Sequence, residues 1–118
     1  MKVVVTFPIP DAAKQIISEH ALLQCWESEE SIPASTLIGW ATDADAILTT
    51  LTCPIDSELL AQATQLKIIS TVSVGVDHID VDAAAARGVI VGHTPGVLTD
   101  STADLTLALM LGVGRRVA

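Results

Sequence analysis

Short runs of β-branched residues alternate with helix-forming segments along the whole chain, and this alternation restricts the fold more than any other feature. Strand patterns cover five segments, at residues 2–7, 22–26, 45–51, 67–72 and 88–94. Helix patterns occur at about 12–20, from 33 through 40, from 56 to about 63, after 80, and from 99 or 100 onward. Strands that alternate with helices in this way form parallel βαβ units. The sequence therefore predicts a doubly wound α/β fold with about five parallel strands and a long C-terminal helix.

Capping residues and apolar positions predict where several helices begin, end and pack. Asp56 and Asp80 each precede a helix pattern, as an N-cap residue does. Gly88 follows the short helix that Asp80 caps, where a C-terminal glycine is common. Ser31 is expected to cap the helix that starts at Pro33. The first helix is expected to bury one face, formed by Ala13, Ile16 and Ile17.

The composition fits a buried parallel sheet. Hydrophobic residues make up 50% of the 118 residues but aromatic residues only 3%, so aliphatic side chains and alanine must supply most of the core. The length corresponds to one domain that can fold without disulfide bonds. Cys25 and Cys53 lack metal-binding spacing, and we expect two reduced, packed thiols, with a disulfide or a reactive thiol as the alternative.

Charge and hydropathy restrict the partners and the compartment. The formal net charge of −8 argues against nucleic acid and anionic membranes as partners. The first ten residues lack the apolar core and the cleavage site of an export signal, and polar residues and glycines interrupt the apolar C-terminal stretch. We therefore expect a cytoplasmic protein without a membrane span.

Three segments are expected to meet at one edge of the sheet, where ligands of doubly wound folds bind. These segments are residues 7–10, 49–53 and 73–77. Gly75 allows a ligand to approach the backbone closely, and the amides of Val74 and Gly75 can donate hydrogen bonds to an anion. The alternative is that Gly75 only supplies a left-handed turn and that Asp77 only caps the next segment.

The second half of the chain resembles a known enzyme family. Residues 70–116 read STVSVGVDHIDVDAAAARGVIVGHTPGVLTDSTADLTLALMLGVGRR, and they are similar to the D-isomer-specific 2-hydroxyacid dehydrogenases. The SVGVDH core and the segment TPGVLTDSTADL are most similar to the glyoxylate/hydroxypyruvate reductase branch of that family. The match is strong from residue 67, whereas residues 1–66 match more loosely, through the order of strands and helices.

The resemblance implies a two-domain enzyme that holds a 2-oxo acid against a nicotinamide cofactor, NAD(P)H. Residues 1–98 would form a flavodoxin-like substrate-binding domain. Residues 99–118 would form a terminal helix that leads toward an NAD(P)-binding Rossmann domain outside this sequence.

The resemblance also implies which residues bind substrate and cofactor. The substrate carboxylate would bind to the backbone amides of one strand-end loop, at Ser73, Val74 and Gly75. The floor of the same pocket would be formed by Leu51 and Thr52. The hydroxyl of Thr102, at the head of the last helix, would reach the dinucleotide.

The sequence also departs from the family. The GxGxxG dinucleotide fingerprint is absent, because Gly112 and Gly114 follow a helix and lack a third glycine. The arginine, acidic residue and histidine that carry out the family's chemistry would come after the end of this sequence. We therefore expect no catalytic residue in this chain, no cofactor bound to it and no turnover by the chain alone.

Other residues with reactive side chains are assigned structural roles. His78 precedes a helix cap and His93 ends a strand, where a packed and hydrogen-bonded imidazole is more common than a proton donor. Asp43 and Asp45 flank a strand start and suggest the acidic pocket of receiver-like folds, but the first strand does not end in a third acidic residue. We therefore expect no metal site.

Two functional hypotheses remain open. In the first, the chain is the substrate-binding part of a reductase that converts glyoxylate-type or hydroxypyruvate-type 2-oxo acids into D-2-hydroxy acids. In the second, it is a free-standing carboxylate-binding or oligomerisation module. The terminal helix is apolar on nearly every side, so we expect a homodimer. The alternative is a monomer whose terminal helix folds back onto its own sheet.

Overall fold

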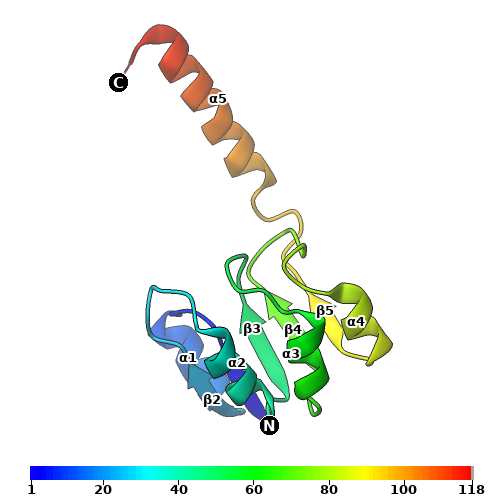
Figure 1. Cartoon of the computed structure of the whole chain (residues 1–118). Helices are drawn as coiled ribbons and strands as arrows, with labels where there is room; N and C mark the ends of the chain where they lie inside the picture. Colours follow the sequence, from blue (N-terminus) through cyan, green and yellow to red (C-terminus); the bar gives the residue numbers. More distant parts are fainter. Residues whose placement is uncertain (118) are drawn as a thin grey trace.

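The computed structural model describes residues 1–117, in which five strands and five helices alternate (Figure 1). Ala118, the last residue of the expected terminal helix, lies outside the described residues. The strands are β1 (Lys2–Val5), β2 (Leu22–Cys25), β3 (Ala46–Thr49), β4 (Ile68–Thr71) and β5 (Ile90–Gly92). The helices are α1 (Asp11–Ser18), α2 (Ala34–Ala41), α3 (Ser57–Gln62), α4 (Val81–Ala86) and α5 (Thr99–Arg115). Each strand lies within a segment predicted from the sequence.

The sheet is parallel throughout and has the order β2-β1-β3-β4-β5. The chain steps from β1 to β2 in one direction and from β3 to β5 in the other, so the order reverses between β1 and β3. Right-handed crossovers then put α1 on one face and α2, α3 and α4 on the other, and α3 does contact both α2 and α4. The predicted fold class, a doubly wound sheet of the flavodoxin-like order, is confirmed.

The core lies between the sheet and the layer of α2, α3 and α4. Val4, Ile47 and Ile69 occupy the middle strands β1, β3 and β4, and each is at most 1% exposed. Leu37 of α2 and Leu60 of α3 are buried in the same cluster. Aliphatic side chains therefore fill this layer, as the composition predicted.

The opposite face of the sheet is only partly covered. Ile68 of β4 and Ile90 of β5 are partners in the strand register, and their exposed fractions are 40% and 66%. Helix α5 does not cover them, because it projects away from the body of the domain (Figure 1). The alternative in which the terminal helix folds back onto its own sheet is therefore wrong for this structure. Among residues 1–117, no helix has both the length and the apolar content needed to span a bilayer.

Two of the three predicted N-caps, and the predicted glycine at a helix C-terminus, are confirmed. A carboxylate oxygen of Asp56 accepts a hydrogen bond from the amide of Leu59 at 2.8 Å, and Asp80 accepts one from Ala83 at 2.9 Å. Gly88, just after α4, has a φ of 71° and so uses the left-handed conformation that favours glycine.

The predicted cap at Ser31 is wrong. Helix α2 begins at Ala34, and its N-cap position is taken by Pro33 itself, whose backbone is extended and whose side chain cannot accept a hydrogen bond. Ser31 lies two residues too early in the chain to reach the first helical amides.

The prediction that Ile16 lies on a buried face of α1 is also wrong. Ile16 is 64% exposed, whereas Ala13 and Ile17 are half-buried. The helix packs beside the edge strand β2. Only a narrow strip of α1 can therefore be covered.

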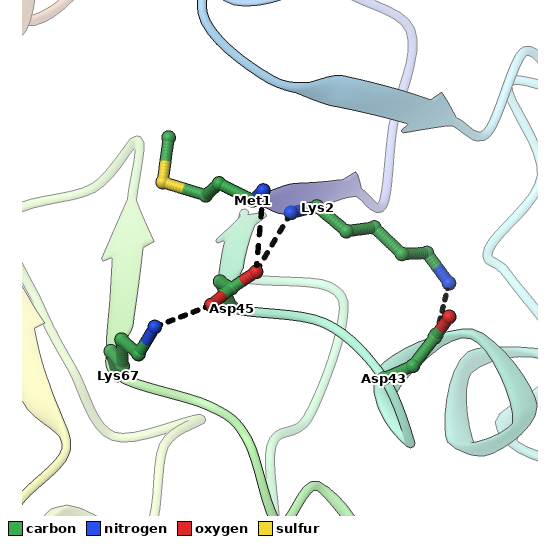
Figure 2. A network of polar contacts seen from close by, with 5 residues as sticks. All are labelled: Met1, Lys2, Asp43, Asp45 and Lys67. Atoms are coloured by element: carbon green, nitrogen blue, oxygen red, sulfur yellow. Dashed lines mark hydrogen bonds and ion pairs between the residues drawn. The ribbon is translucent and has the colours of Figure 1, made fainter.

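The two aspartates considered for an acidic pocket lie at the amino ends of the strands, opposite the edge where ligands bind. A carboxylate oxygen of Asp45 accepts a hydrogen bond from Lys67 Nζ at 2.6 Å, and the other accepts one from the Lys2 amide at 2.9 Å (Figure 2). Lys2 Nζ forms an ion pair with Asp43. Among the described residues, no group of three or more His, Cys, Asp and Glu side chains is placed to hold a metal ion. Lysines therefore neutralise both carboxylates.

Candidate functional site

The loops that follow β1, β3 and β4 open at the same edge of the sheet, beside the point where the strand order reverses. This arrangement confirms the predicted meeting of three segments. Ile55 and Ile79 form a short parallel bridge between the second and third loops. In this bridge the Ile55 amide donates to the carbonyl of His78 at 2.8 Å, and the Asp80 amide donates to the carbonyl of Ile55 at 2.9 Å. The bridge fixes these two loops to each other.

A row of buried hydroxyl groups lies directly beneath these loops. Four polar residues at the carboxyl ends of the strands are at most 5% exposed, namely Thr6, Thr49, Thr71 and Ser73. Thr6 Oγ1 donates to Thr49 Oγ1 at 3.2 Å, and Thr49 Oγ1 donates in turn to the carbonyl of Cys53 at 3.4 Å. Buried hydroxyls are stable only when they are hydrogen-bonded. Only Ser73 was predicted from the sequence, although a threonine stands at or directly after the end of each of β1, β3 and β4.

Ser73 turns its side chain into the protein. Its hydroxyl lies 2.7 Å from the carbonyl oxygen of Gly75 and 2.7 Å from Thr71 Oγ1. Nε2 of His78 lies 3.0 Å from the same Thr71 oxygen. The Ser73 side chain therefore fixes the loop and does not face a ligand.

The backbone amides of Val74 and Gly75 take no part in the hydrogen bonds of the loop. Within residues 1–117, neither N–H has a hydrogen-bond acceptor. Gly75 does not have a positive φ, so the hypothesis of a left-handed turn is wrong. A Cβ at Gly75 would instead lie 3.2 Å from Oδ2 of Asp77, which is tight. Asp77 accepts no hydrogen bond from the described residues, so it is not a cap.

The carbonyl groups of the same loop are held from the side of β5. The Thr94 amide donates to the carbonyl oxygen of Ser73 at 2.9 Å, and Nδ1 of His93 lies 2.8 Å from the carbonyl oxygen of Val74. His93 thus binds the backbone of the loop.

Val74 and Thr102 lie on the same cavity, whereas Leu51 and Thr52 do not. An open cavity of about 640 Å³ separates the first turns of α5 from the β4 loop, and its lining includes Val74, Thr102 and Thr106. Thr52 instead lines a separate cavity of about 130 Å³ between α2 and α3, and Leu51 is 59% exposed. One expected substrate contact, Val74, and the expected cofactor contact, Thr102, therefore line the same cavity.

Burial controls the ionisation of two side chains near this edge. Desolvation lowers the pKa of His78, and the charge of Asp77 opposes this shift only in part. Burial likewise raises the pKa of the Cys25 thiol, with a smaller contribution from Glu27. Both cysteines carry free thiols, and Cys53 is 4% exposed. Cys53 is buried, as expected, but Cys25 is only half-buried, so the predicted packing is confirmed for Cys53 alone.

The described residues do not form a phosphate-binding loop for a dinucleotide. Gly112 and Gly114 lie inside α5, which does not follow a strand through a tight turn. A dinucleotide fingerprint requires such a turn from a strand into a helix N-terminus. We therefore assign no step of hydride transfer to the described residues.

These features define a class of protein, a doubly wound α/β domain whose candidate ligand-binding edge lies beside the switch point. The family model for the catalytic domain of the D-isomer specific 2-hydroxyacid dehydrogenases matches residues 3–112. The chain therefore belongs to this family of NAD(P)-dependent oxidoreductases, as the sequence resemblance predicted.

Individual relatives agree with this assignment. The chain is 41% identical over 116 residues to a glyoxylate reductase of Thermococcus litoralis, an alignment that covers 98% of this chain and 35% of the relative. The solved structure of the TT0316 protein from Thermus thermophilus is 42% identical, with a TM-score of 0.90 over 99% of this chain and 38% of the other. An NAD⁺-bound 3-phosphoglycerate dehydrogenase of Entamoeba histolytica is 26% identical, with a TM-score of 0.76, and the match covers 95% of this chain and 38% of that one. The chain thus spans about a third of the length of such relatives.

Proposed function

We propose that this chain is the substrate-binding part of an NAD(P)-dependent reductase that converts small 2-oxo acids, such as glyoxylate or hydroxypyruvate, into D-2-hydroxy acids. In this proposal the amides of Val74 and Gly75 bind the substrate carboxylate. The relatives named above include a glyoxylate reductase, which favours a small 2-oxo acid.

The observation that carries the proposal is the pair of amides without acceptors beyond the end of β4. Val74 is exposed and Gly75 is half-buried, so a ligand can approach this loop. Two adjacent N–H groups without acceptors, in a loop whose Ser73, Val74 and Gly75 carbonyls are engaged elsewhere, are suited to bind an anion. A carboxylate is the anion that a 2-oxo acid presents.

The chain's own residues would bind and orient the substrate, and the chemical step would require groups beyond this sequence. Hydride transfer needs a bound nicotinamide, a cation for the carboxylate and an acid for the new alkoxide. The cofactor, NAD(P)H, would contact this chain only near Thr102, beside the cavity at the start of α5.

Titration of the isotopically labelled chain with oxalate, an analogue of glyoxylate, tests this site by NMR. The Val74 and Gly75 amide signals are expected to shift, with a dissociation constant of about a millimolar or weaker, because each hydrogen bond contributes only about 0.5–1.5 kcal/mol. Asp77→Asn removes a negative charge beside Gly75 and is expected to tighten binding. Shifts elsewhere with Gly75 unmoved would contradict the assignment.

Assays of the purified chain with glyoxylate or hydroxypyruvate and either NADH or NADPH test the second part of the proposal. We expect no turnover above background, because the chain lacks a dinucleotide loop. Turnover by these 118 residues would mean that the cofactor site has been missed.

One observation favours the second hypothesis, a binding or oligomerisation module. Helix α5 exposes six large hydrophobic side chains, each at least 58% exposed, namely Leu105, Leu107, Leu109, Met110, Leu111 and Val113. A surface of this kind is typical of a helix that packs against a partner. Self-association of the purified chain through α5 is the expected outcome under this hypothesis.

A further inference from the structure

Three successive peptide groups of the β4 loop are each held by their carbonyl oxygen. The Ser73 carbonyl accepts from the Thr94 amide, the Val74 carbonyl from Nδ1 of His93, and the Gly75 carbonyl from the Ser73 hydroxyl. A trans peptide group is planar, so fixing its oxygen also fixes its N–H, which points the opposite way. The three N–H groups concerned belong to Val74, Gly75 and Val76, and within residues 1–117 none has an acceptor.

The hydrogen bonds behind the Gly75 carbonyl can run in only one direction. Ser73 Oγ has one proton, and it donates that proton to the Gly75 carbonyl, which can only accept. Ser73 Oγ must then accept the proton of Thr71 Oγ1, at 2.7 Å. Thr71 Oγ1 then has no second proton to donate to Nε2 of His78, which lies 3.0 Å away. The Thr71 oxygen must therefore accept a hydrogen bond from a protonated Nε2 of His78.

The other ring nitrogen of His78 settles the charge state. Nδ1 is buried and has no hydrogen-bond partner among the described residues. A proton on Nδ1 would be a buried donor without an acceptor, which is costly. The ring is therefore neutral and protonated at Nε2, in agreement with the pKa that burial lowers. His93, by contrast, must carry its proton on Nδ1 to donate to the carbonyl of Val74.

We propose that His78 and His93 are positioning residues that hold the three N–H groups of Val74, Gly75 and Val76 ready for a carboxylate, acting through opposite tautomers. This inference rests on the proposed function and extends the binding loop by one donor, Val76. His78 acts through Thr71 and Ser73 on the Gly75 carbonyl, whereas His93 acts directly on the Val74 carbonyl.

Nitrogen NMR of the free protein near pH 7.5 tests the tautomers without any ligand. We expect His78 to show a protonated Nε2 and a bare Nδ1, and His93 to show a protonated Nδ1. A bare Nε2 on His78, or a protonated Nδ1 on that ring, would overturn the proposal. Backbone order parameters of residues 74–76 should fall in His78→Leu and in His93→Ala, and unchanged values would also overturn it.

Oxalate titration supplies the functional test with matched variants. His78→Leu and His93→Ala are expected to weaken binding about five-fold, the scale of one lost hydrogen bond. His78→Gln and His93→Asn keep an N–H donor near the same atom and should bind within about two-fold of wild type, as should the exposed control His20→Ala. His93 is exposed, so its variants are expected to fold even if His78→Leu does not.

The two proposals fail in different ways. If oxalate moves no amide of residues 74–76 in the wild type, the substrate site is misplaced, and the tautomer and order-parameter data still decide whether the histidines hold the loop. If oxalate binds there and His78→Leu, His93→Ala and wild type bind it equally, the substrate site stands and the positioning role is wrong.

Discussion

The hydroxyl of Thr6 lies 3.2 Å from that of Thr49, and this buried contact joins β1 to β3 where the strand order reverses. The same Thr49 oxygen reaches the carbonyl of Cys53 in the loop that follows β3. The Thr49 side chain thus connects β1 and β3 to a loop of the candidate site.

We predict that Thr49→Val destabilises the protein although valine has nearly the same shape. The substitution leaves the Thr6 hydroxyl and the Cys53 carbonyl without this partner in a buried place, which costs about 1–3 kcal/mol. Urea unfolding measures the change in the free energy of unfolding. Thr64→Val, at an exposed position, is the control and should change stability by at most about 0.5 kcal/mol. Equal stability of the two variants would contradict the role assigned to Thr49.

The ion pairs at the amino ends of the strands should make stability depend on acidic pH. The Lys67 ammonium, above all, lowers the pKa of Asp45 below 3.8, with the Lys2 amide as the second cause. Because the folded-state pKa is the lower one, this stabilisation is present above pH 3.8 and is lost as the pH falls through the folded-state pKa.

Asp45→Asn is therefore expected to lower stability at neutral pH and to flatten the loss of stability below pH 4. Thermal unfolding from pH 7 to pH 2.5 measures both effects. Asp104→Asn, on the exposed helix α5, serves as the control and should leave the acid profile unchanged. A variant profile parallel to that of the wild type would show that Asp45 does not contribute.

His78 should produce a second and separate loss of stability at higher pH. Burial lowers its pKa below 6.5, so the folded state resists protonation that the unfolded state accepts. The protein is therefore not destabilised by His78 above pH 6.5. Its free energy of unfolding decreases as the pH falls from 6.5 toward the folded-state pKa of His78. His78→Gln, which does not titrate, is expected to abolish the part of the decline that begins below pH 6.5. The decline is measured by urea unfolding at successive pH values, and an identical decline in the variant would rule this explanation out.

The sequence predicted correctly those features that are determined by residues close together in the chain. The strand positions and the caps at Asp56 and Asp80 follow from residues within one turn of each feature, and the structure has them where they were expected. Ser31 was misassigned because the proline after it occupies the cap position, and Ile16 because the width of the covering surface depends on tertiary packing.

The candidate site was only half visible in the sequence. Gly75 and its amides were predicted, because a glycine after a β-branched run is a local signal. The hydrogen bonds of Thr49 and of the two histidines were not predicted. They join residues that lie 4 to 43 positions apart in the sequence, and whether such residues meet depends on the register of the strands. Sequence patterns carry no information on which ring nitrogen faces a carbonyl.

The exposed apolar surface of α5 should drive self-association of the chain. Burying one leucine side chain stabilises an assembly by about 1.5–3 kcal/mol, and α5 exposes several such side chains on all its sides. An uncovered strip on the sheet, at Ile68 and Ile90, offers a surface on which the α5 of a second copy can pack. We therefore expect a two-fold dimer, in which the two terminal helices pair or exchange.

Sedimentation equilibrium at tens of micromolar measures this association. Leu109→Glu places a charge in the middle of α5 and is expected to shift the protein to monomer. Ile16→Glu is the matched control, because Ile16 is 64% exposed and Leu109 is 60% exposed, but Ile16 lies on α1. The control should associate like the wild type. A wild type that stays monomeric would reject α5 as the interface. Loss of association in both variants would also reject it, because an interface formed by α5 should be disrupted by Leu109→Glu and not by Ile16→Glu.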